Sequence, residues 1–317
     1  MVAFGSRSFH VALRGLSLLA SMGFLLLVAC AAEGPDPDDV AGEDRAVSAL
    51  TCIPPCLGSP DPFELLFEHA TFETCRLTPD YAFGELVLQN NQYGAGPRGL
   101  DGSHGSTCTH YYRDQQRELF GWDWSLPSTP TFYVYPEAIF GLKPWSGYST
   151  TRLLPAKVAD AYALRADYAV ATQMQGSSLN LAFDIWLTAT EASAPEDIRF
   201  ELMIWEYRRD MTPFGARVAT DVTTSSGVYD LYAGEPDWEP PGTNWTYLAF
   251  ARKEARGAGR VEIGEFLKYL VLRRTITNPA NLFVSSVELG NELGSGSGRT
   301  VVTDFHVGFG TKPIPGP

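Results

Sequence analysis

Short apolar runs, separated by Gly, Pro, Asn and Ser, follow one another from residue 60 to the end of the chain. Runs of this length and spacing predict β-strands, and so many of them are typical of a β-sandwich or a jelly roll. We therefore expect an all-β protein. The predicted strands are Leu86–Asn90, Phe132–Tyr135, Leu179–Thr188, Arg199–Tyr207, Val228–Tyr232, Trp245–Ala251, Phe283–Glu288 and Thr300–Gly308.

One segment, Glu262–Arg273, has the periodicity of an amphipathic helix instead. Its apolar residues Ile263, Phe266, Leu267 and Leu270 recur at the spacing i, i+3, i+4, i+7. We expect one short helix here. The pattern contains no internal repeat and no sign of a second folded domain.

Two of the predicted strands combine acids with aromatic side chains on one face. Alternation along a strand places Asp184 with Trp186, and it places Glu201 with Met203 and Trp205. Indole rings stack on the apolar faces of sugars, and carboxylates accept hydrogen bonds from sugar hydroxyls. The pattern therefore indicates either a sugar-binding cleft or an amphipathic strand face without a specific role.

The N-terminus has the composition of an export signal. A basic region with Arg7 and Arg14 precedes an apolar stretch around Leu16–Val28. That stretch is shorter than the roughly 20 residues that span a bilayer. The ending LVAC, whose cysteine is Cys30, resembles a bacterial lipobox, in which the cysteine becomes lipid-modified after cleavage. We interpret residues 1–29 as a lipoprotein signal peptide; the alternative is an ordinary cleaved signal.

Residues 30–50 are rich in Asp, Glu and Pro and have few large apolar side chains. Such a segment repels itself and stays extended, which predicts a tether to a catalytic domain at residues 51–317. Residue 31 is Ala, so nothing argues for retention at an inner membrane. We expect an exported protein that is lipid-anchored at the bacterial cell envelope, at the outer membrane or cell surface, and contacts the membrane through that anchor only.

The composition narrows the function. The chain has 317 residues, of which 44% are hydrophobic, enough for a substantial core, and its net charge is −13. Phosphate contact requires clustered basic residues, so we expect no nucleic acid as a partner.

The cysteines favour disulfides over metal binding. If Cys30 is lipidated, then Cys52, Cys56, Cys75 and Cys108 remain, an even number in an exported chain, and three pairings are possible. The competing interpretation is a zinc site. No second Cys pair or His pair has zinc spacing, so we expect no metal.

Several motifs occur in one order between residues 70 and 310. They are Asn90–Gly94 (NNQYG), Gly105–Thr109 (GSTCT), Trp122–Ser125 (WDWS), Tyr135–Pro136 (YP), Phe183–Leu187 (FDIWL), Glu201–Trp205 (ELMIW), the helical Gly264–Leu270, and Gly290–Glu292 (GNE). Together they resemble glycoside hydrolase family 12, a group of retaining endo-β-1,4-glucanases and xyloglucanases. The resemblance implies a β-jelly roll sandwich of two antiparallel sheets with a concave substrate cleft.

The resemblance also implies the catalytic residues. Glu201 corresponds to the nucleophile, Glu292 to the general acid/base, and Asp184 to the carboxyl that orients the nucleophile. Glu201 must be ionised while Glu292 holds a proton, and we expect the charge of Glu201 to keep Glu292 protonated. This chemistry requires no cofactor.

Four further residues correspond to the glycone side of the cleft: Asn91, Tyr93, Met203 and Trp205. Glu288 lies on the strand face of Glu292, where the family often has Gln, and is expected to contact substrate. Tyr93 replaces a larger Trp, and Leu293-Gly294 replaces Pro-Phe. Because both catalytic Glu residues are present, we expect altered specificity rather than lost activity.

By the same resemblance, Cys75 pairs with Cys108, which leaves Cys52 to pair with Cys56. We expect a monomeric, retaining endo-acting hydrolase whose partner is a β-1,4-glucan: cellulose, xyloglucan or a mixed-linkage glucan. The alternative is a non-catalytic glycan-binding surface lipoprotein with the same fold.

Overall fold

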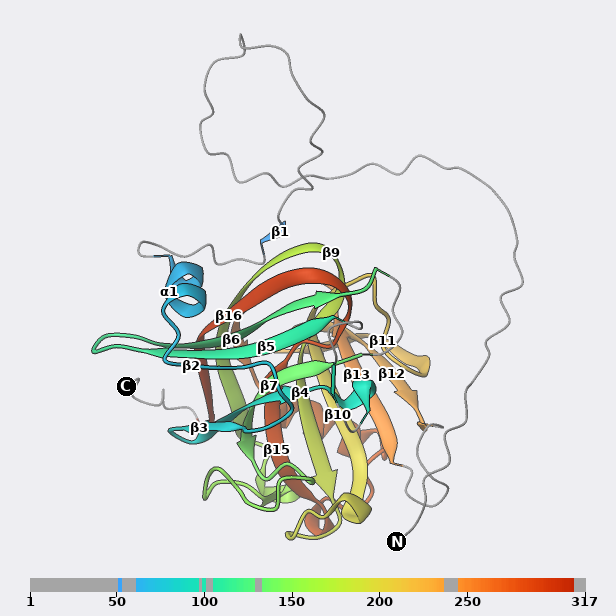
Figure 1. The fold of residues 1–317 in the computed structure, drawn as a ribbon. Helices are drawn as coiled ribbons and strands as arrows, with labels where there is room; N and C mark the ends of the chain where they lie inside the picture. Colours follow the sequence, from blue (N-terminus) through green and yellow to red (C-terminus); the bar gives the residue numbers. More distant parts are fainter. Residues whose placement is uncertain are drawn as a thin grey trace, which may run out of the picture. The chain divides into compact units, whose positions relative to one another are not determined.

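The computed structural model describes six stretches of the chain (Figure 1). They are residues 51–52, 61–96, 99–100, 105–128, 133–236 and 245–310. The predicted signal peptide and tether, with Cys30, lie outside the described residues. Neither α-helix in the described ranges is long and apolar enough to cross a membrane.

The described chain is mostly β-structure, as the apolar pattern predicts. The strands are β1 Thr51–Cys52, β2 Phe72–Thr74, β3 Tyr81–Phe83, β4 Leu86–Asn91, β5 Ser106–Arg113, β6 Glu118–Leu126, β7 Tyr135–Gly141, β8 Ala156–Lys157, β9 Leu164–Thr188, β10 Ile198–Arg209, β11 Ala216–Thr224, β12 Gly227–Gly234, β13 Thr246–Arg252, β14 Ala258–Val261, β15 Phe283–Gly290 and β16 Leu293–Phe309. The helices are α1 Pro62–Glu68 and α2 Ile263–Leu272, with short 3₁₀ turns at Tyr93–Ala95, Val158–Asp160, Pro195–Asp197 and Pro279–Asn281.

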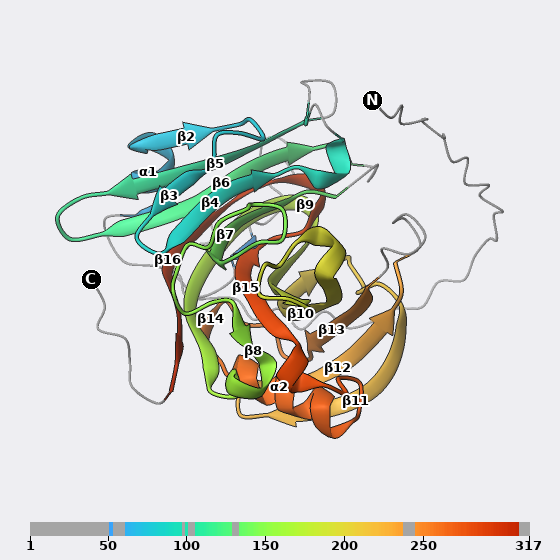
Figure 2. The ribbon, with the colours of Figure 1, turned by 90° about the horizontal axis from the view of Figure 1, so that it is seen from below.

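Two layers share the long strand β9. One layer has the order β11-β12-β13-β10-β9-β15-β7-β4-β3, and in the other β9 pairs with β16, which continues through β6 and β5 to β2. Figures 1 and 2 show β9 and β16 curving from one layer toward the other. The jelly roll is confirmed, but the two sheets form one hydrogen-bonded network because β9 has 25 residues and belongs to both.

The prediction of purely antiparallel sheets is wrong at one place. β10 and β13 pair in parallel, with Glu201 opposite Tyr247 and Met203 opposite Ala249. The chain leaves β10, forms the β11–β12 hairpin and returns as β13 between β12 and β10. Because β13 lies between β12 and β10 and is antiparallel to β12, it runs in the same direction as β10.

The core lies between the layers and confirms the predicted alternation. Phe183, Ile185 and Leu187 of β9 are completely buried, as are Leu202 and Ile204 of β10. Burying each such side chain contributes about 1.5–3 kcal/mol.

Helix α2 covers part of this core, and all four of its predicted apolar residues are completely buried. The ring of Phe266 meets Phe250 edge-on with centroids 4.9 Å apart and Tyr229 with centroids 5.0 Å apart. The predicted helix is confirmed.

The prediction of a single helix is wrong, because α1 is a second one. Asp61 caps it by accepting a hydrogen bond from the backbone N–H of Phe63 at 2.9 Å, and Pro62 starts it. Phe63 and Leu66 pack against Leu119 and neighbouring apolar side chains. A cap residue followed by Pro is a helix-start signal that the strand pattern hid.

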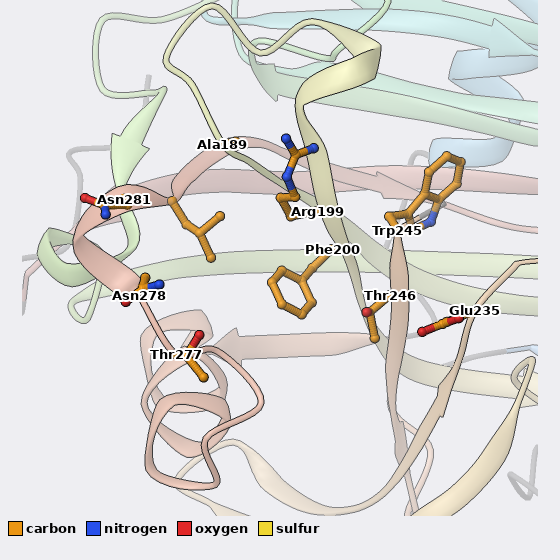
Figure 3. Close-up of a pocket in the computed structure, with 10 residues that line it drawn as sticks. Ala189, Arg199, Phe200, Glu235, Trp245, Thr246, Thr277, Asn278 and Asn281 are labelled. Atoms are coloured by element: carbon orange, nitrogen blue, oxygen red, sulfur yellow. The ribbon is translucent and has the colours of Figure 1, made fainter. Parts of the chain in front are cut away.

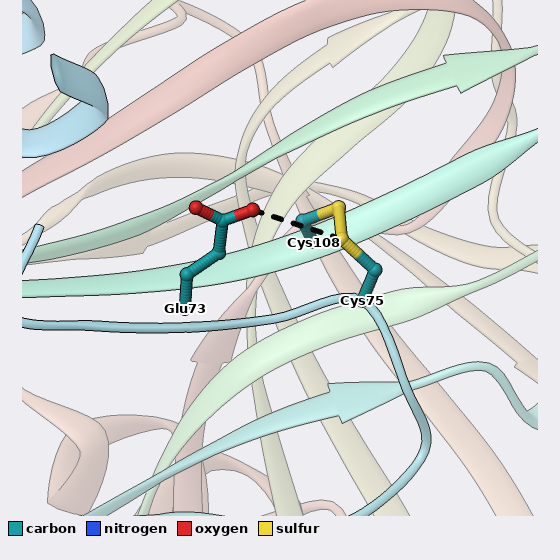
Figure 4. A group of neighbouring side chains, drawn as sticks. All are labelled: Glu73, Cys75 and Cys108. Atoms are coloured by element: carbon teal, nitrogen blue, oxygen red, sulfur yellow. Dashed lines mark hydrogen bonds between the residues drawn. A yellow bond between two sulfur atoms is a disulfide. The ribbon is translucent and has the colours of Figure 1, made fainter.

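A disulfide joins Cys75 to Cys108, as the resemblance implies (Figure 4). It connects the segment after β2 to β5 across a sequence separation of 33 residues. Closing a loop of this length contributes on the order of 3–4 kcal/mol in the chain-entropy model. The predicted Cys52–Cys56 pair lies outside the described side chains.

Candidate active site

The site lies on the face of the β10–β9–β15 strands that points away from the core. Asp184 of β9 is opposite Met203 of β10 on one side and Glu288 of β15 on the other, and Glu201 is opposite Trp186. Residues opposite one another on neighbouring strands point to the same side of a sheet. The register therefore brings the predicted acids of three strands onto one face.

An apolar layer forms the floor of this face. Its members are Tyr135, Ala182, Met203, Trp205, Tyr232, Tyr247, Ala249 and Ala251. Met203 and Trp205 are almost fully buried, and the indole N–H of Trp205 lies 3.3 Å from Met203 Sδ. Two of the four residues predicted to line the glycone side therefore belong to the packed floor of the site.

Glu201 is half-buried and is held by a tryptophan. The indole N–H of Trp245 donates a hydrogen bond to Glu201 Oε2 at 2.7 Å. Trp245 in turn meets Trp186 edge-on, with centroids 5.5 Å apart. A donor at this distance stabilises the ionised carboxylate, which is the form that a nucleophile requires.

Glu292 lies in the short connection between β15 and β16 and is held by Asn180 of β9. Asn180 Nδ2 donates to Glu292 Oε2 at 2.5 Å, and the Glu292 backbone N–H donates to Asn180 Oδ1 at 2.9 Å. The hydroxyl of Tyr93 lies 3.5 Å from Glu292 Oε1.

Burial raises the pKa of Glu292 to about 7, although the hydrogen bonds from Asn180 and Tyr93 lower it. The expectation that the charge of Glu201 keeps Glu292 protonated is therefore replaced by a different cause, removal from water. The result for the chemistry is the same, because a carboxyl with a pKa of about 7 still carries its proton at mildly acidic pH.

Asp184 is 6% exposed. Burial raises its pKa well above the usual range, and the charges of Glu201 and Glu288 raise it further. A protonated Asp184 is a hydrogen-bond donor, which suits a residue that orients the carboxylate of Glu201.

The charges of the three predicted catalytic acids all act on the phenol of Tyr247. Burial raises the pKa of Tyr247 well above its usual range, and the charges of Glu292, Glu201 and Asp184 raise it further. Tyr247 is opposite Glu201 in register, and its hydroxyl lies 3.4 Å from Met203 Sδ. The three predicted catalytic residues therefore share one electrostatic environment.

Tyr93 and Asn91 are more exposed than Glu288, the third of these predicted substrate residues. Tyr93 is 55% exposed and Asn91 is half-buried, so both border open space. Glu288 is completely buried, with Ser286 Oγ 2.7 Å and Lys143 Nζ 3.2 Å from its carboxyl oxygens. These partners enclose the Glu288 carboxyl in this structure, and its contact with substrate stays a prediction.

The sequence interpretation missed Trp245, Asn180, Tyr247 and Lys143 as residues of the site. Asn180 carried a signal, because strand alternation places it on the face of Asp184. The positions of Trp245 and Tyr247 depend on the parallel pairing of β13 with β10, for which the local pattern contains no signal.

A pocket of about 480 Å³ adjoins Trp245 at the beginning of β10 and β13 (Figure 3). Figure 3 shows Trp245 and Glu235 on one side of it, and Asn278 and Asn281 on the other. Its lining residues are Ala189, Arg199, Phe200, Glu235, Trp245, Thr246, Thr277, Asn278, Asn281 and Leu282. The pocket therefore borders the tryptophan that holds Glu201.

Two groups of side chains have the composition of metal ligands within the described ranges. Glu73 lies beside Cys75 and Cys108, but their sulfurs form the disulfide and offer no thiolate (Figure 4). The other group, Glu64, Glu68 and His69, is exposed on and after α1.

A jelly roll that carries a hydrogen-bonded carboxyl and a second, buried carboxyl of raised pKa above an aromatic floor matches one class of protein, the glycoside hydrolases with two catalytic carboxyls. The profile of Glycosyl hydrolase family 12 matches residues 84–309, and the chain belongs to this family.

Known proteins agree with this assignment. Endoglucanase S of Pectobacterium parmentieri is 27% identical over 192 residues, which cover 59% of this chain and 70% of that protein. A family 12 xyloglucanase from Bacillus licheniformis superposes with a TM-score of 0.66 at 23% identity, covering 75% of this chain and 99% of that one. Endoglucanase 3 of Trichoderma harzianum gives 0.59 at 17% identity, covering 75% and 97%. At these identities the two structures show a shared fold.

Proposed function

We propose that the protein is a retaining, endo-acting hydrolase of β-1,4-glucans. The observation that carries the proposal is the pair of Glu201, held by an indole N–H, and Glu292, whose pKa is raised to about 7. One group is prepared to attack as a carboxylate and the other to donate a proton. The Pectobacterium relative is named an endoglucanase and the Bacillus structure a xyloglucanase, which supports a glucan as substrate.

In the first step, protonated Glu292 gives its proton to the glycosidic oxygen while the Glu201 carboxylate attacks the anomeric carbon. The bond from that carbon to the oxygen breaks, the shortened chain leaves as an alcohol, and a glycosyl ester forms on Glu201. In the second step, Glu292, now a carboxylate, takes a proton from water as the water attacks the same carbon. The ester bond breaks, Glu201 is again a carboxylate, and the product keeps its anomeric configuration.

Trp245 and Asp184 support Glu201 in this scheme. The indole N–H limits rotation of the carboxylate through its 2.7 Å hydrogen bond. Asp184 lies on the same face of the neighbouring strand β9, where burial favours its protonated form, and we assign it the role of a second donor to Glu201. Both groups restrict Glu201 to the orientation that attacks a sugar above the floor, which is how fixed geometry lowers a barrier.

The binding-only alternative lacks a comparable observation. A protein that only binds sugar has no use for a buried carboxyl that titrates at about 7 beside a second, hydrogen-bonded carboxylate. Glucan hydrolysis by the wild-type protein separates the two functions. We expect reducing ends to appear with cellulose, xyloglucan or mixed-linkage glucan, and ¹H NMR of the first product should show the β-anomer; an α-anomer first would contradict double displacement.

We further propose that the protein is exported and anchored by a lipid on Cys30, and that it acts as a monomer. The support is the sequence of residues 1–50. Wild-type protein expressed in bacteria should partition into the detergent phase, and Cys30→Ser should move it to the aqueous phase with its glucanase activity intact. Size-exclusion chromatography of the Cys30→Ser protein should give the mass of one chain.

A further inference from the structure

A buried charged cluster lies on the same sheet face as the catalytic acids, toward β7, and takes no part in the two chemical steps. It consists of Glu137 in β7, Glu288 in β15 and Lys143, which follows β7. Both carboxyls are completely buried, and Lys143 is 6% exposed. Lys143 Nζ lies 2.5 Å from Glu137 Oε1 and 3.2 Å from Glu288 Oε2. One ammonium group therefore connects two strands that pair with each other.

The backbone around Lys143 holds the side chain in this place. Leu142 N donates to the carbonyl of Ser285 in β15 at 2.8 Å. The carbonyl of Lys143 accepts hydrogen bonds from both the backbone N–H and the hydroxyl of Ser146, each at 2.9 Å. The turn that begins at Lys143 is thus fastened on both sides of the residue.

The cluster contacts Asn91, a predicted substrate residue, through one shared oxygen atom of Glu137. Glu137 Oε1, which contacts Lys143, also accepts a hydrogen bond from Asn91 Nδ2 at 2.8 Å. An oxygen that faces an ammonium group acts as an acceptor, so it fixes which end of the Asn91 amide points toward it. The NH₂ group of Asn91 faces Glu137, which leaves the amide oxygen directed elsewhere.

The proton count of the cluster is consistent with this role. Burial raises the pKa of Glu137 well above its usual range, and the charge of Glu288 raises it further. A proton on Glu137 Oε2 leaves Oε1 as the acceptor for both Lys143 and Asn91. Lys143 also contacts the carboxyl of Glu288, which replaces the Gln common in the family.

We propose that Lys143 is a positioning residue: by holding Glu137 Oε1 it fixes the Asn91 amide in the orientation that binds a glucan hydroxyl. The inference rests on the proposed function, since it concerns how the same site holds its sugar. Lys143 does not touch substrate and acts through Glu137 on Asn91.

A double-mutant cycle tests this coupling. Hydrolysis of a soluble β-glucan is measured for the wild type, Lys143→Met, Asn91→Ala and the double variant. A sugar contact present in both the bound and transition states appears mainly in KM, so each single variant should raise KM about tenfold with kcat little changed. Because both changes remove the same contact, the double variant should also show about tenfold, and a rise of about a hundredfold would overturn the proposal.

A charge-balanced variant covers the case in which Lys143→Met fails to fold. Lys143→Met combined with Glu288→Gln removes the cation together with one of its two carboxyl partners. Its KM should rise about tenfold, as for Lys143→Met alone, whereas a wild-type KM would show that the ammonium does not position Asn91. The matched control is Lys157→Met, an exposed lysine in β8, which should keep the wild-type KM. An inactive wild type would contradict the proposed function itself, whereas an active wild type with independent effects would contradict the role of Lys143 alone.

Discussion

Two buried acid clusters flank strand β10 and its neighbours, and they differ in how their charge is balanced. On the core side, Glu206 is completely buried. It accepts hydrogen bonds from the hydroxyls of Tyr168 and Tyr229, each at 2.7 Å, and from Arg256, with Arg252 3.8 Å away. One carboxyl group thus faces two guanidinium groups and two phenols, and each of its oxygens accepts at least one hydrogen bond.

On the concave side the balance is reversed. Asp184, Glu137 and Glu288 share one buried cation, Lys143, and burial together with the neighbouring carboxylates raises the pKa of both Asp184 and Glu137. Around Glu206, donors from separate segments of the chain converge on one buried carboxyl and connect those segments. On the concave face buried carboxyls outnumber their cation, and burial raises the pKa of Glu292, the carboxyl that acts as the catalytic acid, to about 7.

The largest effect is expected on activity, from Glu201→Ala. Removing the nucleophile should lower kcat by more than about 10³-fold, because nothing else on this face can form the glycosyl ester. The unfolding transition in urea should stay near that of the wild type. Glu292→Ala, by comparison, should still cleave substrates with a good leaving group and should respond to azide by giving the β-glycosyl azide. Substantial activity in Glu201→Ala would remove Glu201 from the mechanism.

The second largest effect is expected on stability, from Glu206→Leu. The variant leaves Arg252 and Arg256 without their buried partner, which should lower the free energy of unfolding by about 3–5 kcal/mol. Below its unfolding transition the variant should keep the wild-type kcat, because Glu206 lies on the side of β10 away from the cleft. Glu191→Leu, at an exposed position, should change stability by less than about 0.5 kcal/mol and serves as the control. A loss of kcat in folded Glu206→Leu would show that the two sides are coupled.

The sequence predicts the acids of the concave face better than it predicts the residues that hold them. Alternation along β9 and β10 predicts that Asp184 and Glu201 face away from the core, and the disulfide and α2 follow from motif and periodicity. Alternation and motifs do not predict contacts between strands that lie far apart in the sequence. Trp245 reaches Glu201 only because β13 inserts beside β10 in parallel. The strand pattern places Glu288 on the cleft face but contains no signal for its contact with Lys143.

The third prediction concerns pH and distinguishes the hydroxyl of Tyr93 from its ring. Catalysis requires protonated Glu292, so kcat/KM should fall as pH rises through about 7. The Tyr93 hydroxyl stabilises the ionised form of Glu292 and lowers its pKa. Tyr93→Phe should therefore raise that pKa and move the basic limb to higher pH. Tyr148→Phe, which changes an exposed tyrosine in the loop after β7, should leave the limb in place. A basic limb that moves to lower pH in Tyr93→Phe would contradict the hydrogen bond to Glu292.

The smallest effect is expected from Tyr93→Trp, which changes both properties of this residue at once. An indole offers more stacking area than a phenol, so KM should fall by roughly fivefold, corresponding to roughly 1 kcal/mol for one aromatic contact. The indole lacks the hydroxyl, so the basic limb should move upward as in Tyr93→Phe. Measuring KM at mildly acidic pH, where Glu292 is protonated in every variant, separates the two effects: stacking changes KM there, and the hydroxyl changes only the pH dependence. If KM is unchanged at that pH while the basic limb moves, Tyr93 acts on Glu292 and does not stack on the sugar. If KM falls and the limb stays, the ring contacts the glucan and the 3.5 Å contact with Glu292 has no influence on its proton.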